Sequence, residues 1–141
     1  MANKNKTIVI GVGRLGSGIA NRAAAKGQDV IVVDPNPEAF YGLDDTFSGF
    51  KVNADSTDMF ALEEHCDIKT AGQVVIVTGD DNVNLFLAYV CSLVYAVPRI
   101  FVRFDDPDKG ALVEGLQNVK AIYPFDLTLV KFNEIEQVER K

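Results

Sequence analysis

Three glycines are the residues of this chain whose spacing best fits a defined chemistry. Gly11, Gly13 and Gly16 follow the apolar run Thr7–Ile10 and open onto the helix-like stretch Arg14–Lys26. In a strand–turn–helix unit, the first glycine permits a tight turn, the second lets backbone approach a diphosphate, and the third lets the helix pack closely. The free N–H groups and the dipole of the helix start then favour an anion. The pattern predicts a dinucleotide-type phosphate site.

An acid after the second apolar run supports this interpretation. Asp34 directly follows Val30–Val33. It lies about 20 residues past the glycines, where a carboxylate accepts hydrogen bonds from ribose hydroxyls. Each such bond is worth roughly 1.5–3 kcal/mol, and the same charge disfavours the 2′-phosphate of NADP. The alternative is a degenerate domain that keeps its glycines only for packing.

The elements that must position these residues alternate along the chain. The expected strands are Thr7–Ile10, Val30–Val33, Phe50–Val52, Val74–Val77, Ile100–Val102 and Ala121–Tyr123. The expected helices are Arg14–Lys26, Glu38–Tyr41, Met59–His65, Asp81–Ala96, Lys109–Leu116 and Leu127–Glu139. Near-continuous apolar strands between helices predict an α/β fold. We expect a doubly wound, Rossmann-like parallel sheet of six strands in the order 3-2-1-4-5-6, with a C-terminal helix.

Ligands of such a sheet bind outside the carboxyl ends of the strands, so the loops there supply further candidates. Thr78 and Gly79 follow the fourth strand, where Gly79 lets backbone pass close to a ligand and Thr78 offers a hydroxyl. Asp55 and Ser56 follow the third strand, and either contact with adenine or capping of the next helix is open for them. Arg103 follows the fifth strand.

Other polar residues near these loops have simpler interpretations. Arg14 either forks onto phosphate oxygens, those of its own ligand or of a neighbouring subunit, or is a solvated surface group. Asp80–Asn82 are typical of a helix start. His65 and Cys66 are adjacent on a helix and therefore point to different sides, so we expect no catalytic pair. One histidine and two distant cysteines predict no metal site.

Length and composition limit the function classes. The chain has 141 residues, which fits one domain with one core. A net charge of −6 without a basic run argues against binding of nucleic acid or anionic lipid through charge. The two cysteines fit a reducing cytosol. Residues 1–6 are expected to be a disordered lead. Residues 125–141 are expected to form a helical tail that seats against the domain or reaches a partner.

One uncharged stretch, 82–98, contains the almost wholly apolar run Leu85–Val97. This run is too short for a comfortable membrane span, and Pro98 ends it. It predicts a helix buried on most of its surface, with no direct membrane insertion. A helix that is apolar on nearly all sides also suggests a second packing partner, such as another subunit.

The ordered series of motifs resembles the amino-terminal domain of RCK proteins, the regulators of potassium conductance. The motifs are Gly11–Gly16, Val33–Asp34, Ala54–Asp58, Val77–Asn84 and Val102–Arg103. The resemblance covers about Lys6 to Lys131. RCK proteins are cytosolic subunits of Trk- and Ktr-type potassium uptake systems and gating domains of some potassium channels. The resemblance implies NAD(H) or ATP/ADP as ligand, and a homo-dimer or larger ring on a membrane channel or transporter subunit.

The resemblance also implies roles for individual residues. It places the diphosphate at Gly11, Gly13, Arg14, Leu15 and Gly16. It assigns Asp34 to the ribose, Asp55 and Ser56 to the adenine edge, Thr78 and Gly79 to the inner wall, and Arg103 to the phosphates. Many relatives continue into a second, ligand-sensing domain that has no counterpart in this sequence. Several carry an acid directly after the proline that follows the last strand, whereas in this chain Phe125 stands there and Asp126 follows one place later, so the resemblance does not carry over a shared cation.

We therefore expect a nucleotide-sensing regulator and not an enzyme, because the sequence shows no substrate domain, acid–base pair or free nucleophile. Binding alone does work if the nucleotide prefers one assembly geometry. The expected location is cytoplasmic, on the inner face of the membrane through a partner subunit. One rival is a small NAD-dependent oxidoreductase or its cofactor-binding domain. Another is a Rossmann relic that only mediates assembly through Leu85–Val97.

Overall fold

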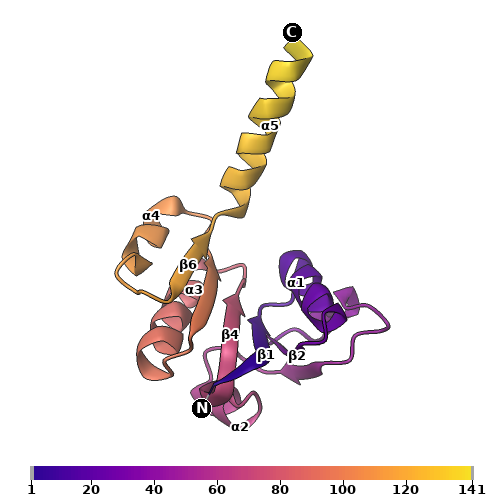
Figure 1. Ribbon diagram of the computed structural model, residues 1–141, viewed down its shortest axis with the longest axis vertical. Helices are drawn as coiled ribbons and strands as arrows, with labels where there is room; N and C mark the ends of the chain where they lie inside the picture. The colour runs from indigo at the N-terminus through magenta and orange to yellow at the C-terminus, as the bar shows by residue number, and fades with distance from the viewer. Residues whose placement is uncertain (1, 141) are drawn as a thin grey trace.

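A six-stranded parallel sheet organises residues 2–140, which are the residues that the computed structural model describes (Figure 1). Its strands are β1 (Asn3–Ile10), β2 (Asp29–Asp34), β3 (Phe50–Asn53), β4 (Ala71–Ile76), β5 (Arg99–Arg103) and β6 (Val119–Ile122). Their order is β3-β2-β1-β4-β5-β6, and every pair is parallel. The predicted fold class and strand order are confirmed. Met1 and Lys141, in the predicted lead and tail, lie outside the described residues.

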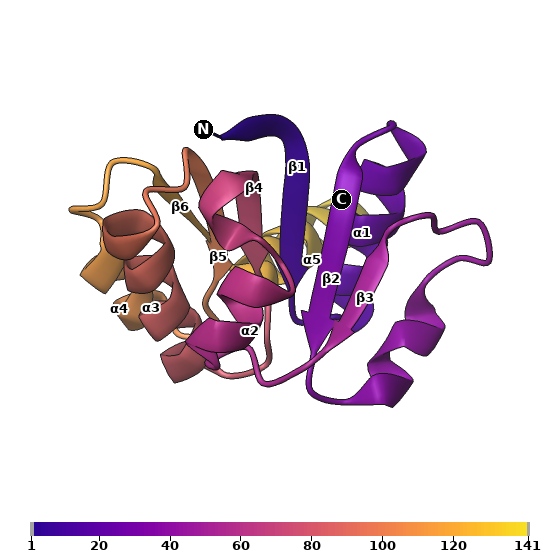
Figure 2. The same ribbon diagram turned by 90° about the horizontal axis from the view of Figure 1, so that it is seen from below.

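Helices connect the strands and cover both faces of the sheet. The α-helices are α1 (Arg14–Ala25), α2 (Met59–Glu64), α3 (Asp81–Tyr89), α4 (Pro107–Gly110) and α5 (Pro124–Arg140). Shorter 3₁₀ segments are η1 (Pro37–Gly42), η2 (Ile68–Thr70) and η4 (Ala111–Val113), and η3 (Val90–Val94) is a π-helical turn. Figure 2 shows α2 on one side of the sheet and α1 on the other.

Two apolar clusters hold the layers together, because successive residues of a strand point to opposite faces. On one face, Ile8 of β1 packs in a cluster with Leu87 of α3. On the other face, Val9 of β1 and Val32 of β2 pack in a cluster with Ala20 of α1. The central strands are thus buried on both sides, which is why their sequences are nearly continuous in β-branched residues.

The first strand begins earlier than the sequence pattern predicts. Residues 3–6 are not a disordered lead: they continue β1, and Asn3 lies opposite Ala71 of β4. The Lys6 ammonium donates to the Asp67 carbonyl oxygen at 2.9 Å and lies 3.6 Å from the carboxylate of the same residue. Hydrogen bonds to distant residues therefore hold this polar segment in the sheet, although it has no apolar pattern of its own.

The helix predicted over 81–96 is interrupted, and it is less buried than expected. α3 gives way to the wider turn η3, and Ala96 follows with a φ of 51°. Cys91 is buried, but Leu93 and Val94 are 68% and 66% exposed. The expectation of a helix buried on most of its surface is therefore wrong. The wider π turn changes the direction of the side chains that follow it.

The last helix, α5, projects away from the sheet (Figure 1). Every described residue of α5 from Phe125 onward is exposed, including Phe132, Ile135 and Val138 of its apolar stripe. Of the two expectations for the tail, seating against the domain is wrong within the described chain. No described helix is long and apolar enough to cross a membrane.

Both cysteines lie fully buried in the cluster beneath α3. Burial raises the pKa of the Cys66 thiol to about 11 and that of the Cys91 thiol to about 12. Because the thiolate is the reactive form, we expect neither cysteine to react with a maleimide near neutral pH in the folded protein. Both should react in denaturant, which serves as the control, and rapid labelling of the folded protein would contradict the prediction. Mass spectrometry reads out both conditions.

Candidate functional site

A cavity of about 510 Å³ lies at the carboxyl ends of β1, β2 and β4, and we call it the β1–β4 cleft. It forms where the strand order reverses, the usual ligand position in such sheets. The predicted residues that line it are Gly11, Gly13, Asp34, Asp55, Ser56, Thr78, Gly79 and Arg103. The lining residues that were not predicted as ligand contacts are Pro35, Asn36, Ala39, Val77, Asp80 and Val83.

The three glycines of the first turn are needed for different structural reasons. Gly11 has a φ of 94°, and a Cβ there would lie 2.7 Å from the Thr78 backbone nitrogen. A Cβ on Gly16 would overlap the Gly11 carbonyl oxygen. Gly13 lines the cleft, and a Cβ there would meet no atom within 4 Å. Packing therefore requires Gly11 and Gly16, whereas Gly13 leaves open space in the cleft.

The start of α1 is left open, unlike those of its neighbours. α2, α3 and α4 begin after Asp58, Asp80 and Asp106, whose carboxylates accept from first-turn N–H groups. This confirms Asp80 as a helix-start residue. α1 begins after Gly13, and among the described residues no side chain caps it and no acid stands in its first turn. Its free N–H groups and dipole therefore suit an anion.

Asp34 is held rigidly at the edge of the cleft. One carboxylate oxygen accepts from the Val12 N–H at 2.8 Å, and the other accepts from the Asn36 N–H at 2.8 Å. Each carboxylate oxygen still has a second lone pair for a further donor. The carboxylate is therefore oriented and able to accept hydrogen bonds from two ribose hydroxyls.

Asp55 lines the cleft and closes its own turn. Its carboxylate accepts from the Thr57 N–H at 2.9 Å and the Thr57 hydroxyl at 2.8 Å, and these bonds lower the pKa of Asp55. The alternative in which Asp55 or Ser56 caps the next helix is wrong. Asp58 caps α2, and its carboxylate accepts from the Phe60 N–H at 3.0 Å.

Asn84 fixes the inner wall of the cleft, and the sequence analysis missed it. It is fully buried. Its side-chain N–H groups donate to the Thr78 carbonyl at 3.0 Å and the Arg103 carbonyl at 2.9 Å, and its oxygen accepts from the Thr78 hydroxyl. It thereby ties the end of β4 to the end of β5. An available signal was its helical spacing with Leu87 and Ala88, which puts an amide on an apolar face.

Two of the predicted diphosphate contacts, Arg14 and Leu15, do not line the cleft. Arg14 and Leu15 line a neighbouring cavity between α1 and α5. Arg103 borders both this cavity and the cleft. Its guanidinium donates to the Asp105 carboxylate at 2.9 Å and lies 6.0 Å from the centre of the Phe125 ring. Of these two arginines, Arg103 lines the cleft and Arg14 does not.

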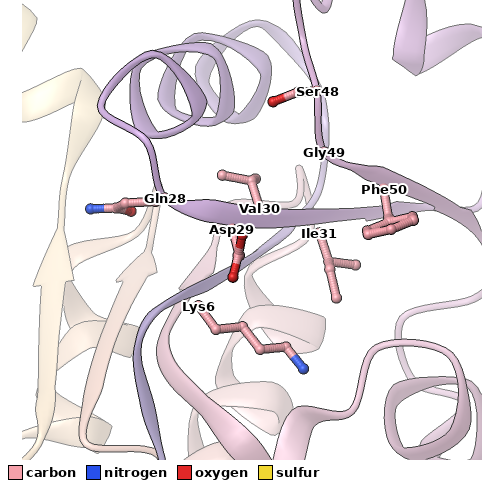
Figure 3. Close-up of a pocket in the computed structure, with 8 residues that line it drawn as sticks. All are labelled: Lys6, Gln28, Asp29, Val30, Ile31, Ser48, Gly49 and Phe50. Carbon is pink, nitrogen blue, oxygen red and sulfur yellow. The ribbon is translucent and has the colours of Figure 1, made fainter.

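A third cavity, of about 320 Å³, lies near the amino ends of β2 and β3 (Figure 3). Figure 3 shows Lys6 and Ser48 on opposite sides of β2. The Lys6 ammonium is already bonded to Asp67 and Thr70, so the polar groups of this cavity do not converge on one ligand. Within residues 2–140, no three His, Cys, Asp or Glu side chains gather where they could hold a metal ion.

Comparisons with known proteins agree with the motifs. The TrkA-N domain family matches residues 7–124. The Trk system potassium uptake protein TrkA of Streptomyces coelicolor is 30% identical over 109 residues, covering 77% of this chain and 48% of that protein. The TrkA homologue of Pyrococcus horikoshii is 26% identical over 116 residues, covering 82% and 50%. The chain thus spans about half the length of these relatives.

Solved structures share the fold. The TrkA-N domain of the inner membrane protein ybaL from Escherichia coli matches with a TM-score of 0.79 at 12% identity, covering 96% of this chain and 98% of that one. The NAD(P)-binding domain of an exopolyphosphatase-related protein from Archaeoglobus fulgidus gives 0.66 at 26%, covering 96% and 98%. The GsuK channel bound to NAD gives 0.66 at 23%, covering 82% and 20%. The chain therefore belongs to the TrkA-N domain family, the amino-terminal domain of RCK proteins that its motifs resemble.

Proposed function

We propose that this chain is the nucleotide-binding part of a cytoplasmic regulator that acts on a membrane potassium channel or transporter subunit without catalysing a reaction. One observation carries the proposal: an uncapped helix start and a carboxylate held by two backbone N–H groups line the same cleft. The family and its relatives named as potassium uptake proteins support the regulatory role.

The cleft suits an adenine nucleotide or dinucleotide, NAD(H) or ATP/ADP. The diphosphate would lie against the backbone at Gly13, and the ribose hydroxyls would donate to Asp34. The adenine would extend toward Asp55 and Ser56. The Asp34 charge opposes a 2′-phosphate, so NADP is the disfavoured form.

Regulation would act through assembly. Exposed apolar side chains on η3 and α5, such as Leu93, Val94 and Phe132, are available for contacts between copies of this chain or with a partner. A nucleotide that binds one assembly geometry more tightly than another shifts the population toward it. In this proposal a homo-dimer or larger ring transmits that shift to a membrane subunit at the inner face.

The Asp34→Ala variant tests the ligand assignment. We expect it to bind NAD and ATP alike about 100-fold more weakly, since two charge-assisted bonds to the ribose are lost. Isothermal titration calorimetry measures both affinities, and thermal unfolding without ligand shows that the variant is folded. Asp45→Ala is the matched control, because Asp45 is exposed and outside the cleft. Unchanged titration curves for the Asp34 variant would remove this residue from the site.

A further inference from the structure

Three arginines line the cavity between α1 and α5, and two of them, Arg14 and Arg22, do not line the nucleotide cleft. The cavity between α1 and α5 has a volume of about 520 Å³, and we call it the arginine cavity. Arg14 and Arg22 of α1 and Arg103 of β5 all line it, although the chain as a whole carries a net charge of −6. Arg14 and Arg22 share one face of α1, because residues at i, i+4 and i+8 align along a helix. Three arginines from two elements therefore line one cavity.

Most of this charge has no partner among the residues that the structure describes. Among residues 2–140, the Arg14 and Arg22 guanidiniums form no ion pair or hydrogen bond. Arg103 is paired with Asp105, at 2.9 Å. Within the described part of the chain, the only carboxylate paired with these arginines is thus that of Asp105. Planar guanidinium groups of this kind match phosphate and carboxylate oxygens in paired hydrogen bonds.

The remainder of the cavity is largely apolar. Leu15 and Ile19 of α1 line it, together with Pro124 and Phe125 at the start of α5. The Thr128 hydroxyl, also in the lining, already donates to the Pro124 carbonyl at 3.0 Å. The complementary molecule therefore carries an oxyanion for the arginines and an apolar group for this lining. A hydrated inorganic ion would satisfy only the first of these.

We propose that the arginine cavity binds a small organic anion, a phosphate or carboxylate attached to an apolar group, at a site separate from the nucleotide cleft. Arg103 borders both spaces. An anion that draws the Arg103 guanidinium away from Asp105 changes a wall of the cleft, so the two sites are coupled. The site does not depend on the proposed nucleotide function.

Phenyl phosphate and benzoate are the probes, with phenol as the uncharged control. We expect at least one of the two anions to bind the parent protein, and phenol not to bind. Arg22→Ala should weaken anion binding about tenfold or more. Lys26→Ala removes the same charge from a neighbouring turn outside the cavity and should change the affinity less than about twofold. Calorimetry measures each affinity, and thermal unfolding confirms that both variants fold.

The outcomes separate this proposal from the nucleotide assignment. Binding of neither anion, or equal affinities for the Arg22→Ala variant and the parent, would each overturn the arginine cavity as a site. If the Asp34→Ala variant binds NAD and ATP as the parent does while anion binding still depends on Arg22, the ligand assignment of the cleft falls and this proposal stands. Preference for phenyl phosphate or for benzoate identifies which oxyanion the cavity takes.

Discussion

The Gly16→Ala variant should lose more than about 4 kcal/mol of unfolding free energy, or fail to fold. The new Cβ would overlap the Gly11 carbonyl oxygen and lie 2.9 Å from the Gly11 carbonyl carbon. The turn cannot retreat, because the position of a Cβ on Gly11 is itself only 2.7 Å from the Thr78 backbone nitrogen. Backbone is thus packed against backbone on both sides. Chemical denaturation followed by circular dichroism measures the loss.

Gly18→Ala is the matched control for this prediction. Gly18 lies in the same helix and is exposed, and a Cβ there would meet no atom within 4 Å. Alanine is the better helix former by about 1 kcal/mol, so this variant should be neutral or more stable than the parent. Similar losses for the Gly16 and Gly18 variants would mean that helix α1, and not its contact with Gly11, is what the substitution at Gly16 disturbs.

The Gly13→Ala variant should keep its fold and lose its phosphate ligand. Gly13 has a φ of −69°, which alanine adopts without strain, and a Cβ there meets no protein atom within 4 Å. The methyl group would instead occupy the space where we propose that the diphosphate approaches the backbone. We expect ADP and NAD to bind about 100-fold more weakly, since the loss of several charge-assisted N–H bonds has that order of effect.

Adenosine supplies the ligand control for Gly13→Ala, because it carries no phosphate and should bind the variant and the parent alike. Gly115→Ala supplies the protein control, since Gly115 is exposed, lies outside the cleft and has open space around its Cβ position. Calorimetry gives the affinities, and the melting temperature reports the fold. Equal binding of ADP by the Gly13→Ala variant and the parent would place the diphosphate away from the glycine turn.

The strand order was predictable because the strongest sequence signals are also the strongest physical ones. Runs such as Val30–Val33 are buried on both faces, so their composition directly reflects their environment. The start of β1 was missed for the opposite reason. Lys6 and its polar neighbours join the sheet through bonds to a loop more than sixty residues away, and no local pattern records such a contact.

The residues that line the cleft were largely predictable because they follow the carboxyl ends of strands that the sequence itself predicts. Side-chain direction was not predictable in the same way. The resemblance assigns Arg14 to the diphosphate, and in this structure Arg14 lines the neighbouring cavity together with Arg22. The role of Asn84 could not be predicted, because the sequence does not show which groups its amide bonds. Its partners are the carbonyls at the ends of two strands.

The attachment of α5 gives it the properties of a lever arm. Its 17 residues correspond to a rod of about 25 Å. The helix is attached directly after β6, where the Leu127 N–H donates to the Tyr123 carbonyl oxygen. The Arg103 guanidinium lies 6.0 Å from the centre of the Phe125 ring at the start of the helix. A tilt of about 10° at this hinge sweeps the tip through about 4 Å. A molecule in contact with the tip of α5 would be displaced by a similar distance.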